Sequence, residues 1–278
     1  MSDETPGPDE AEDAKALVAQ VFSDSAATYD QVVDFFAPFG RALVAGAEIP
    51  DGAQVLDVAS GRGACLYPAL EAVGRDGFVT GVDLAPGMVD ALAADLAARG
   101  IDNAAVRVGD AEALDLPDAS VDAVLGGFMI FFCPNPDQVL AEFHRVLRPG
   151  GVVALTIFDG DTPSAFLRQV GQEIFGGQQE PRASEAFDRA EVLDPALERA
   201  GFDAPEAFDV HEEIRFECAE QMERWHRSHF ARLLLDVLDE QQLGIYRHRM
   251  TEHLEAFRVG DAFVLPQRAR VTVARKLA

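Results

Sequence analysis

Apolar and polar positions alternate on two different scales through the middle of this chain. Short apolar runs predict buried strands, and the segments after them carry apolar residues at the three-to-four-residue spacing of a helix that covers one face. The predicted strands are 54–58, 79–84, 105–108, 121–126 and 152–158, and the predicted helices between them are 64–73, 87–99 and 137–147. This alternation predicts a parallel sheet whose ligands bind at the carboxyl ends of its strands.

The pattern is different on either side of this stretch. Before it, we expect helices at 14–22 and 31–47, the second kinked at Pro38. After it, the pattern predicts helices at 162–177, 188–200, 219–238 and 240–257, and strands at 206–216 and 270–276. Because the later helices are rich in aromatic and apolar residues, we expect a lid with a pocket for an apolar or aromatic small molecule.

The clearest chemical signal lies in residues 55–64, which read VLDVASGRGA. A strand ends at the acid Asp57, a glycine turn follows, and a helix begins. Dehydrogenases place G-x-G-x-x-G directly after the strand, whereas here Leu66 occupies the place of the third glycine. A second acid, Asp83, follows Gly61 at about the 20-residue spacing of a ribose-binding acid. The missing glycine argues against a pyrophosphate, and therefore against a dehydrogenase.

This combination resembles the class I S-adenosylmethionine-dependent methyltransferases, and most closely the small-molecule branch that includes the ubiquinone and menaquinone C-methyltransferases. The resemblance continues through residues 109–114 (GDAEAL), 121–128 (VDAVLGGF) and 147–151 (LRPGG), in the order that the family shows. The sequence departs from the branch at 60–62, where Ser-Gly-Arg replaces the usual Cys-Gly-Thr. We expect cofactor binding to survive this change because these positions act mainly through their backbone.

The resemblance implies a Rossmann-like, doubly wound α/β fold with a seven-stranded, mostly parallel sheet and a helical lid, in which the terminal strand is the antiparallel insertion. The predicted division is a disordered acidic tail (1–14), N-terminal lid helices (15–48), an AdoMet-binding core (49–160), a lid insertion (161–187), a continuation of the core (188–218), further lid helices (219–262) and the terminal core strand (263–278).

The resemblance also implies S-adenosylmethionine as the cofactor and assigns residues to it. Gly61 and Gly63, together with Ala59, would let the backbone approach its amino-acid moiety. Asp57 would order the glycine loop and hold the ammonium group through water, and Asp83 would accept both ribose hydroxyls.

A second group of residues would surround the adenine and the methyl group. By family position, Asp110 would meet the adenine amino group and Ala111 would supply a backbone contact. Leu84 and Met88 would flank adenine and ribose, and Phe128 would lie near the methyl group. Plain core packing is the alternative for Met88 and Phe128.

Catalysis by such a protein depends first on orientation, which can contribute about 7–11 kcal/mol, and only then on a base. Tyr29 matches a tyrosine that closes over the methionine end of the cofactor in many relatives; the alternative is a hydrophobic staple. His226 and His229 are candidate bases because histidine titrates near neutrality, although the same pair would suit a solvated helix face. Glu173 is a further candidate, and an acidic phenol or an activated carbon needs no base.

Composition limits the partners. The chain has 48 acidic against 23 basic residues, a net charge of −25, which disfavours nucleic acid because affinity for it depends on lysine and arginine. No apolar run approaches the ~20 residues of a membrane span, so we expect no membrane partner. The three cysteines are too scattered for a disulfide framework or a metal site. We expect a cytoplasmic monomer or homodimer with a small-molecule substrate.

The sequence therefore predicts AdoMet-dependent methylation of a small organic acceptor, such as a quinone-like, phenolic or other specialised metabolite. Two alternatives stay open. The fold could use the same cofactor for a reaction without net methylation, such as a cyclisation or an aminopropyl transfer. It could also be a non-catalytic protein that keeps the cofactor site as a structural or regulatory element.

Overall fold

One mixed sheet organises the computed structural model, which describes residues 7–159, 163–177 and 183–277. Its strands are β1 (Gln54–Val58), β2 (Phe78–Asp83), β3 (Ala104–Val108), β4 (Val121–Gly127), β5 (Leu147–Phe158), β6 (Glu206–Phe216), β7 (Arg258–Val259) and β8 (Ala262–Arg275). The order is β3-β2-β1-β4-β5-β8-β6, with the short β7 paired only to β8. Strands β1 to β5 are parallel and β8 is antiparallel to both neighbours, so the predicted sheet with an antiparallel terminal strand is confirmed.

Helices cover both faces of the sheet. They are α1 (Pro8–Ser25), α2 (Ala37–Ala47), α3 (Leu66–Val73), α4 (Pro86–Arg99), α5 (Pro136–Val146), α6 (Pro163–Phe175), α7 (Ala190–Arg199), α8 (Ala219–Arg227), α9 (Arg232–Leu235) and α10 (Glu240–Glu255), with 3₁₀ turns η1 (Ile130–Phe132) and η2 (Ala183–Asp188). Alternate strand residues face opposite ways. Leu56 of β1 therefore joins the core under α5 and α7, while its neighbour Val55 joins the core under α2, α3 and α4.

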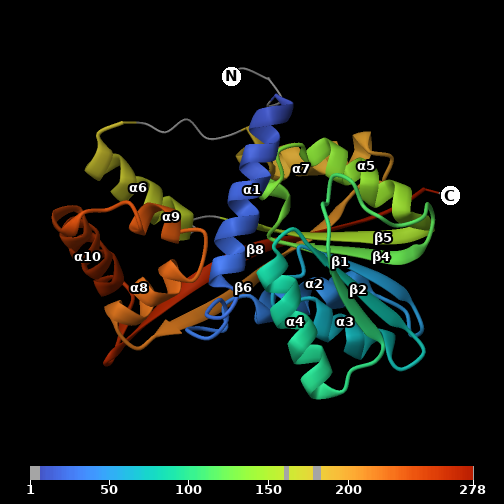
Figure 1. The fold of residues 1–278 in the computed structure, drawn as a ribbon, viewed down its shortest axis with the longest axis horizontal. Coiled ribbons are helices and arrows are strands. Elements are labelled where there is room, and N and C mark those ends of the chain that lie inside the picture. Colours follow the sequence, from blue (N-terminus) through green and yellow to red (C-terminus); the bar gives the residue numbers. More distant parts are fainter. Residues whose placement is uncertain (1–6, 160–162, 178–182, 278) are drawn as a thin grey trace.

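A third apolar cluster lies under the lid. The strands β6 and β8 extend beyond the parallel strands, and α6, α8, α9 and α10 gather at that end of the molecule (Figure 1). Tyr246 and Phe216 are almost fully buried there, beside Met222 and Trp225 of α8. The cluster also contains Phe128 at the end of β4, so the lid and the strand ends share one core.

Several boundaries differ from the prediction. The helix α1 begins at Pro8 rather than at 14, because proline is favoured in a first turn and Glu10 accepts a hydrogen bond from the Gly7 N–H. The first six residues of the predicted disordered tail lie outside the described residues. The helix α2 begins at Ala37, which places Pro38 in its first turn, where it causes no kink.

The lid contains a second correction. The expected helix at 219–238 is broken into α8 and α9, because the chain turns after Arg227 and the Ser228 hydroxyl donates back to the Trp225 carbonyl at 2.8 Å. The terminal strand begins at Ala262 rather than at 270. Among the described residues, no helix has the length and apolar character needed to cross a membrane.

Candidate cofactor and acceptor site

A cavity of about 850 Å³ opens at the carboxyl ends of β1, β2 and β4, within the usual range of ligand sites. Its walls come from the core strands, from α1 and from the lid helices. The structure brings most of the predicted site residues together here: Tyr29, Asp57, Ala59, Gly61, Asp83, Leu84, Met88, Asp110, Ala111, Phe128, His226 and His229. Gly63 belongs to the same loop without lining the cavity, and Glu173 lies elsewhere.

The glycine loop is held in an unusual backbone conformation. Ala59, Gly61 and Gly63 have φ angles of 55°, 50° and 90°, in the left-handed region that glycine adopts without strain. A Cβ at Gly63 would lie 2.8 Å from the Tyr67 ring, so a side chain does not fit. Ala59 is not glycine, and such a backbone costs about 1–3 kcal/mol that the surrounding structure must offset. Strain of this kind is typical of a functional site.

Two buried acids flank this loop. Asp57, 1% exposed, accepts a hydrogen bond from the backbone N–H of Leu66, while its Oδ2 has no partner. Asp83 accepts from the Gly61 N–H at 2.8 Å and from the Ala85 N–H at 2.9 Å. Burial raises the pKa of both carboxyls, and the charge of Asp83 raises that of Asp57 further. A bound cation would offset both effects, so the site favours a positively charged ligand.

A lysine closes the end of the cavity at Asp110. Lys15 of α1 donates to Asp110 Oδ2 at 2.7 Å and pairs with Glu112 at 2.8 Å, although its side chain is only 13% exposed. Partial burial lowers the pKa of Lys15, but its hydrogen bonds with the two acids raise it overall. The helix is fixed again where Ser23 accepts from the Gly87 N–H at 3.2 Å. The sequence gave one hint of this role, because Lys15 is one of only two lysines in the chain.

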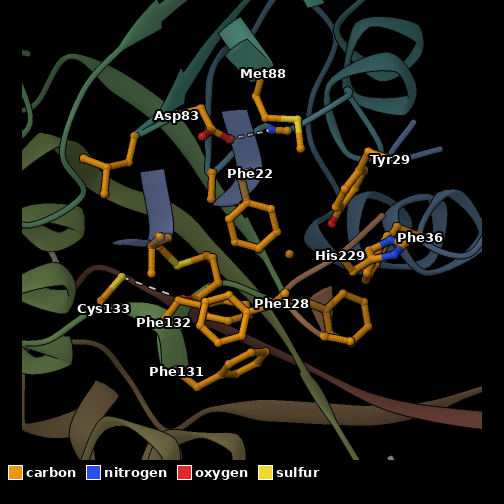
Figure 2. A pocket seen from close by; sticks show the side chains of 18 of the residues that line it. Phe22, Tyr29, Phe36, Asp83, Met88, Phe128, Phe131, Phe132, Cys133 and His229 are labelled. Atoms are coloured by element: carbon orange, nitrogen blue, oxygen red, sulfur yellow. Dashed lines mark hydrogen bonds between the residues drawn. The ribbon is translucent and has the colours of Figure 1, made fainter. Parts of the chain in front are cut away.

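Aromatic rings form the opposite part of the cavity. Tyr29 stacks on Phe36, with ring centroids 5.5 Å apart and nearly parallel planes, and its hydroxyl points into the cavity (Figure 2). Phe128, which has a strained φ of 53°, packs on Phe36 and Phe158. Rings that the sequence analysis did not assign also line the space: Phe22, Phe131, Phe132 and Phe230. The run FMIFF after the fourth strand was the available signal for two of them.

His229 is neutral and its tautomer is fixed. Its Nδ1 lies 2.7 Å from the Trp225 carbonyl oxygen, which can only accept, so Nδ1 carries the proton. The Nε2 atom therefore holds a lone pair, and it has no hydrogen-bond partner. Burial lowers the pKa of His229 to about 4. The ring lies 4.5 Å from that of Tyr29, inside the aromatic part of the cavity (Figure 2).

His226 is also buried in the cavity wall. Its Nδ1 is 2.7 Å from the Tyr246 hydroxyl, its Nε2 has no partner, and burial lowers its pKa to about 3. The two histidines are 1% and 9% exposed, so the alternative of a solvated helix face is wrong. The lid core buries this face of α8 against Phe35 and Phe216, which sequence spacing alone does not reveal.

The structure contradicts a base role for Glu173. Both of its carboxylate oxygens accept from Arg249 at 2.8 Å, on the outer side of the lid and away from the cavity. This hydrogen bonding lowers the pKa of Glu173, which makes it a weaker base. Glu173 is therefore corrected from a candidate base to a partner in an exposed ion pair.

Comparisons with known proteins agree with this geometry. Residues 55–151 match the family model described as a methyltransferase domain. The chain is 37% identical over 203 residues to aklanonic acid methyltransferase DauC of Streptomyces sp. strain C5, covering 68% of this chain and 92% of that protein. It is 32% identical over 261 residues to nocamycin O-methyltransferase of Saccharothrix syringae, covering 86% and 91%.

Two further similarities cover the expected branch and the fold. The ubiquinone/menaquinone C-methyltransferase of Xanthomonas campestris is 33% identical over 162 residues, covering 56% of this chain and 64% of that protein. A phosphoethanolamine N-methyltransferase of Haemonchus contortus in complex with S-adenosyl-L-methionine shares the fold, with a TM-score of 0.58, 17% identity and coverage of 92% and 57%. The chain belongs to the class I methyltransferases, which use S-adenosylmethionine as their cofactor and, in this branch, act on small molecules.

Proposed function

We propose that this methyltransferase transfers the methyl group of S-adenosylmethionine to a hydroxyl oxygen of an aromatic small molecule. The observation that carries the proposal is the unpaired Nε2 lone pair of His229 inside a cavity walled by aromatic rings. The names of two relatives support it, since one is an O-methyltransferase and the other acts on an organic acid, and both are covered over more than 90% of their length.

The residues around the glycine loop fit the cofactor. The unpartnered Asp57 Oδ2 offers a buried acceptor of negative charge for its ammonium group, directly or through water. We assign the ribose hydroxyls to Asp83, at the end of β2, and the adenine end to Asp110 and Ala111. The left-handed backbone at Gly61 leaves open space where a ligand can approach the main chain, since a Cβ there would meet only the Ala59 carbonyl at 3.9 Å.

The chain's contribution to the transfer is orientation and proton removal. When bound, S-adenosylmethionine supplies an electrophilic methyl group on a positively charged sulfur, which leaves as a neutral thioether. The rings of Phe36, Phe128 and Tyr29 hold the acceptor and exclude water, so that its oxygen faces the methyl group. His229 Nε2 takes the hydroxyl proton as the carbon–oxygen bond forms. Burial raises the pKa of Tyr29, so its hydroxyl stays protonated and can donate a hydrogen bond.

The test is a product analysis. Purified protein is incubated with S-adenosylmethionine and a panel of phenols, naphthols and hydroxyanthraquinones, and the acceptor mass and the S-adenosylhomocysteine formed are measured together. The proposal predicts one methyl group gained per S-adenosylhomocysteine. A product of unchanged mass would favour a non-methylating reaction, and cofactor binding without any turnover would favour a non-catalytic protein. Asp83→Ala serves as the control, because it should lose cofactor binding and all turnover together.

A further inference from the structure

Trp225 carries a buried hydrogen-bond donor without a partner in the acceptor part of the cavity. Its side chain is 4% exposed, it lines the cavity, and its indole Nε1 has no hydrogen-bond acceptor. The ring is held between Phe35, at 4.8 Å, and Phe216, at 5.7 Å. A buried donor that lacks a partner costs about 1–3 kcal/mol, so a ligand that supplies an acceptor removes this cost when it binds.

The proton of Trp225 complements the lone pair of His229. Indole can only donate, and the His229 Nε2 can only accept because Nδ1 holds the proton. The two rings are 4.8 Å apart and line the same cavity. A ligand that satisfies both must present one donor and one acceptor on neighbouring atoms of one edge. A single phenolic hydroxyl offers a donor to His229 and leaves Trp225 without a strong acceptor.

We propose that Trp225 is a specificity-determining residue, and that the acceptor is an aromatic ketone or quinone whose reacting hydroxyl lies beside a ring carbonyl. Trp225 donates to the carbonyl oxygen while His229 accepts from the hydroxyl. The placement of the hydroxyl at His229 rests on the proposed function. The hydrogen bond to a conjugated carbonyl also withdraws electron density from the ring, which makes the neighbouring hydroxyl more acidic and assists its deprotonation by His229.

The experiment compares two isomers of one probe. In 1-hydroxyanthraquinone the hydroxyl lies beside the carbonyl, and in 2-hydroxyanthraquinone it lies away from it, while size and apolar surface are equal. Binding of both is measured by calorimetry in the presence of S-adenosylhomocysteine. Trp225 is the only tryptophan of the chain, so quenching of its fluorescence shows that each isomer occupies this cavity. The same titrations are repeated with Trp225→Phe, which keeps an aromatic ring and removes the N–H.

We expect both isomers to quench Trp225, the 1-isomer to bind about tenfold more tightly to the wild type, and Trp225→Phe to lose that preference while its affinity for the 2-isomer changes little. Equal binding of the isomers by the wild type, a preference that persists in Trp225→Phe, or no quenching by either isomer would overturn the proposal. Methyl transfer is assayed separately. An isomer preference without any transfer would refute the proposed function and leave the recognition standing, whereas transfer without a preference would do the reverse.

Discussion

The buried carboxylate of Asp57 makes a strong prediction, because it should weaken the empty protein and strengthen the complex. Asp57→Asn keeps the shape of the side chain and removes its charge. The amide oxygen can still accept from the Leu66 N–H, and the amide nitrogen takes the place of the unpartnered Oδ2. Burial and Asp83 both oppose the charge of Asp57 in the empty site, so the variant relieves an unfavourable arrangement.

The expected magnitudes follow from these contacts. An unsatisfied buried group costs about 1–3 kcal/mol, and the new amide nitrogen also lacks a partner, so the net stabilisation of the empty protein is about 1 kcal/mol. That corresponds to a melting temperature about 2–4 °C higher. Loss of one member of a buried charge pair costs about 2–5 kcal/mol in binding, which predicts an affinity for S-adenosylmethionine about 30- to 5,000-fold lower.

Thermal unfolding with and without S-adenosylmethionine, together with calorimetry, measures both effects. The wild type should bind more tightly as pH rises, because the raised pKa of Asp57 keeps part of it protonated at low pH and the cationic ligand binds the ionised form. Asp57→Asn should lose this contribution to the pH dependence. Wild-type affinity in the variant would refute the assignment of Asp57 to the cofactor.

Three further predictions concern other parts of the site. His229→Gln should lower kcat by about 10²–10⁴, with less loss on acidic nitrophenols, and wild-type kcat/KM should fall only as pH drops toward about 4, since the neutral imidazole is the active form; a fall near 6.5 would contradict this. Tyr246→Phe leaves the buried Nδ1 of His226 unpaired and should lower stability by about 1–3 kcal/mol in thermal unfolding. Lys15→Met should speed release of S-adenosylhomocysteine by up to about fivefold in stopped-flow measurements, and an unchanged rate would argue against α1 as a cover for the cofactor.

Local sequence patterns were sufficient for the core and for its acids. Each parallel strand carries its own apolar run, and Asp57 and Asp83 stand at or near the ends of strands whose carboxyl edges meet at one side of the sheet. The relevant information therefore lies within a few residues of each position. The predicted topology, including the antiparallel terminal strand, follows from this regularity together with the family resemblance.

The lid was harder to predict because its side chains are placed by distant partners. The helix α8 is rich in charged residues, which suggested a solvated face, yet Trp225 and His226 are buried by rings from other elements. Glu173 is neutralised by Arg249, 76 residues further along the chain, and Lys15 meets Asp110 across 95 residues. Such pairings leave no periodic signal in a single sequence.

The central claim, transfer of a methyl group to an oxygen, is tested most directly by the position of a labelled methyl group. The protein is incubated with 1-hydroxyanthraquinone and S-adenosylmethionine labelled with ¹³C in the methyl group, and the product is examined by NMR. The account predicts a single labelled methoxy carbon on the ring hydroxyl, absent with His229→Gln. A label on a ring carbon, or an acceptor altered without any label, would contradict it.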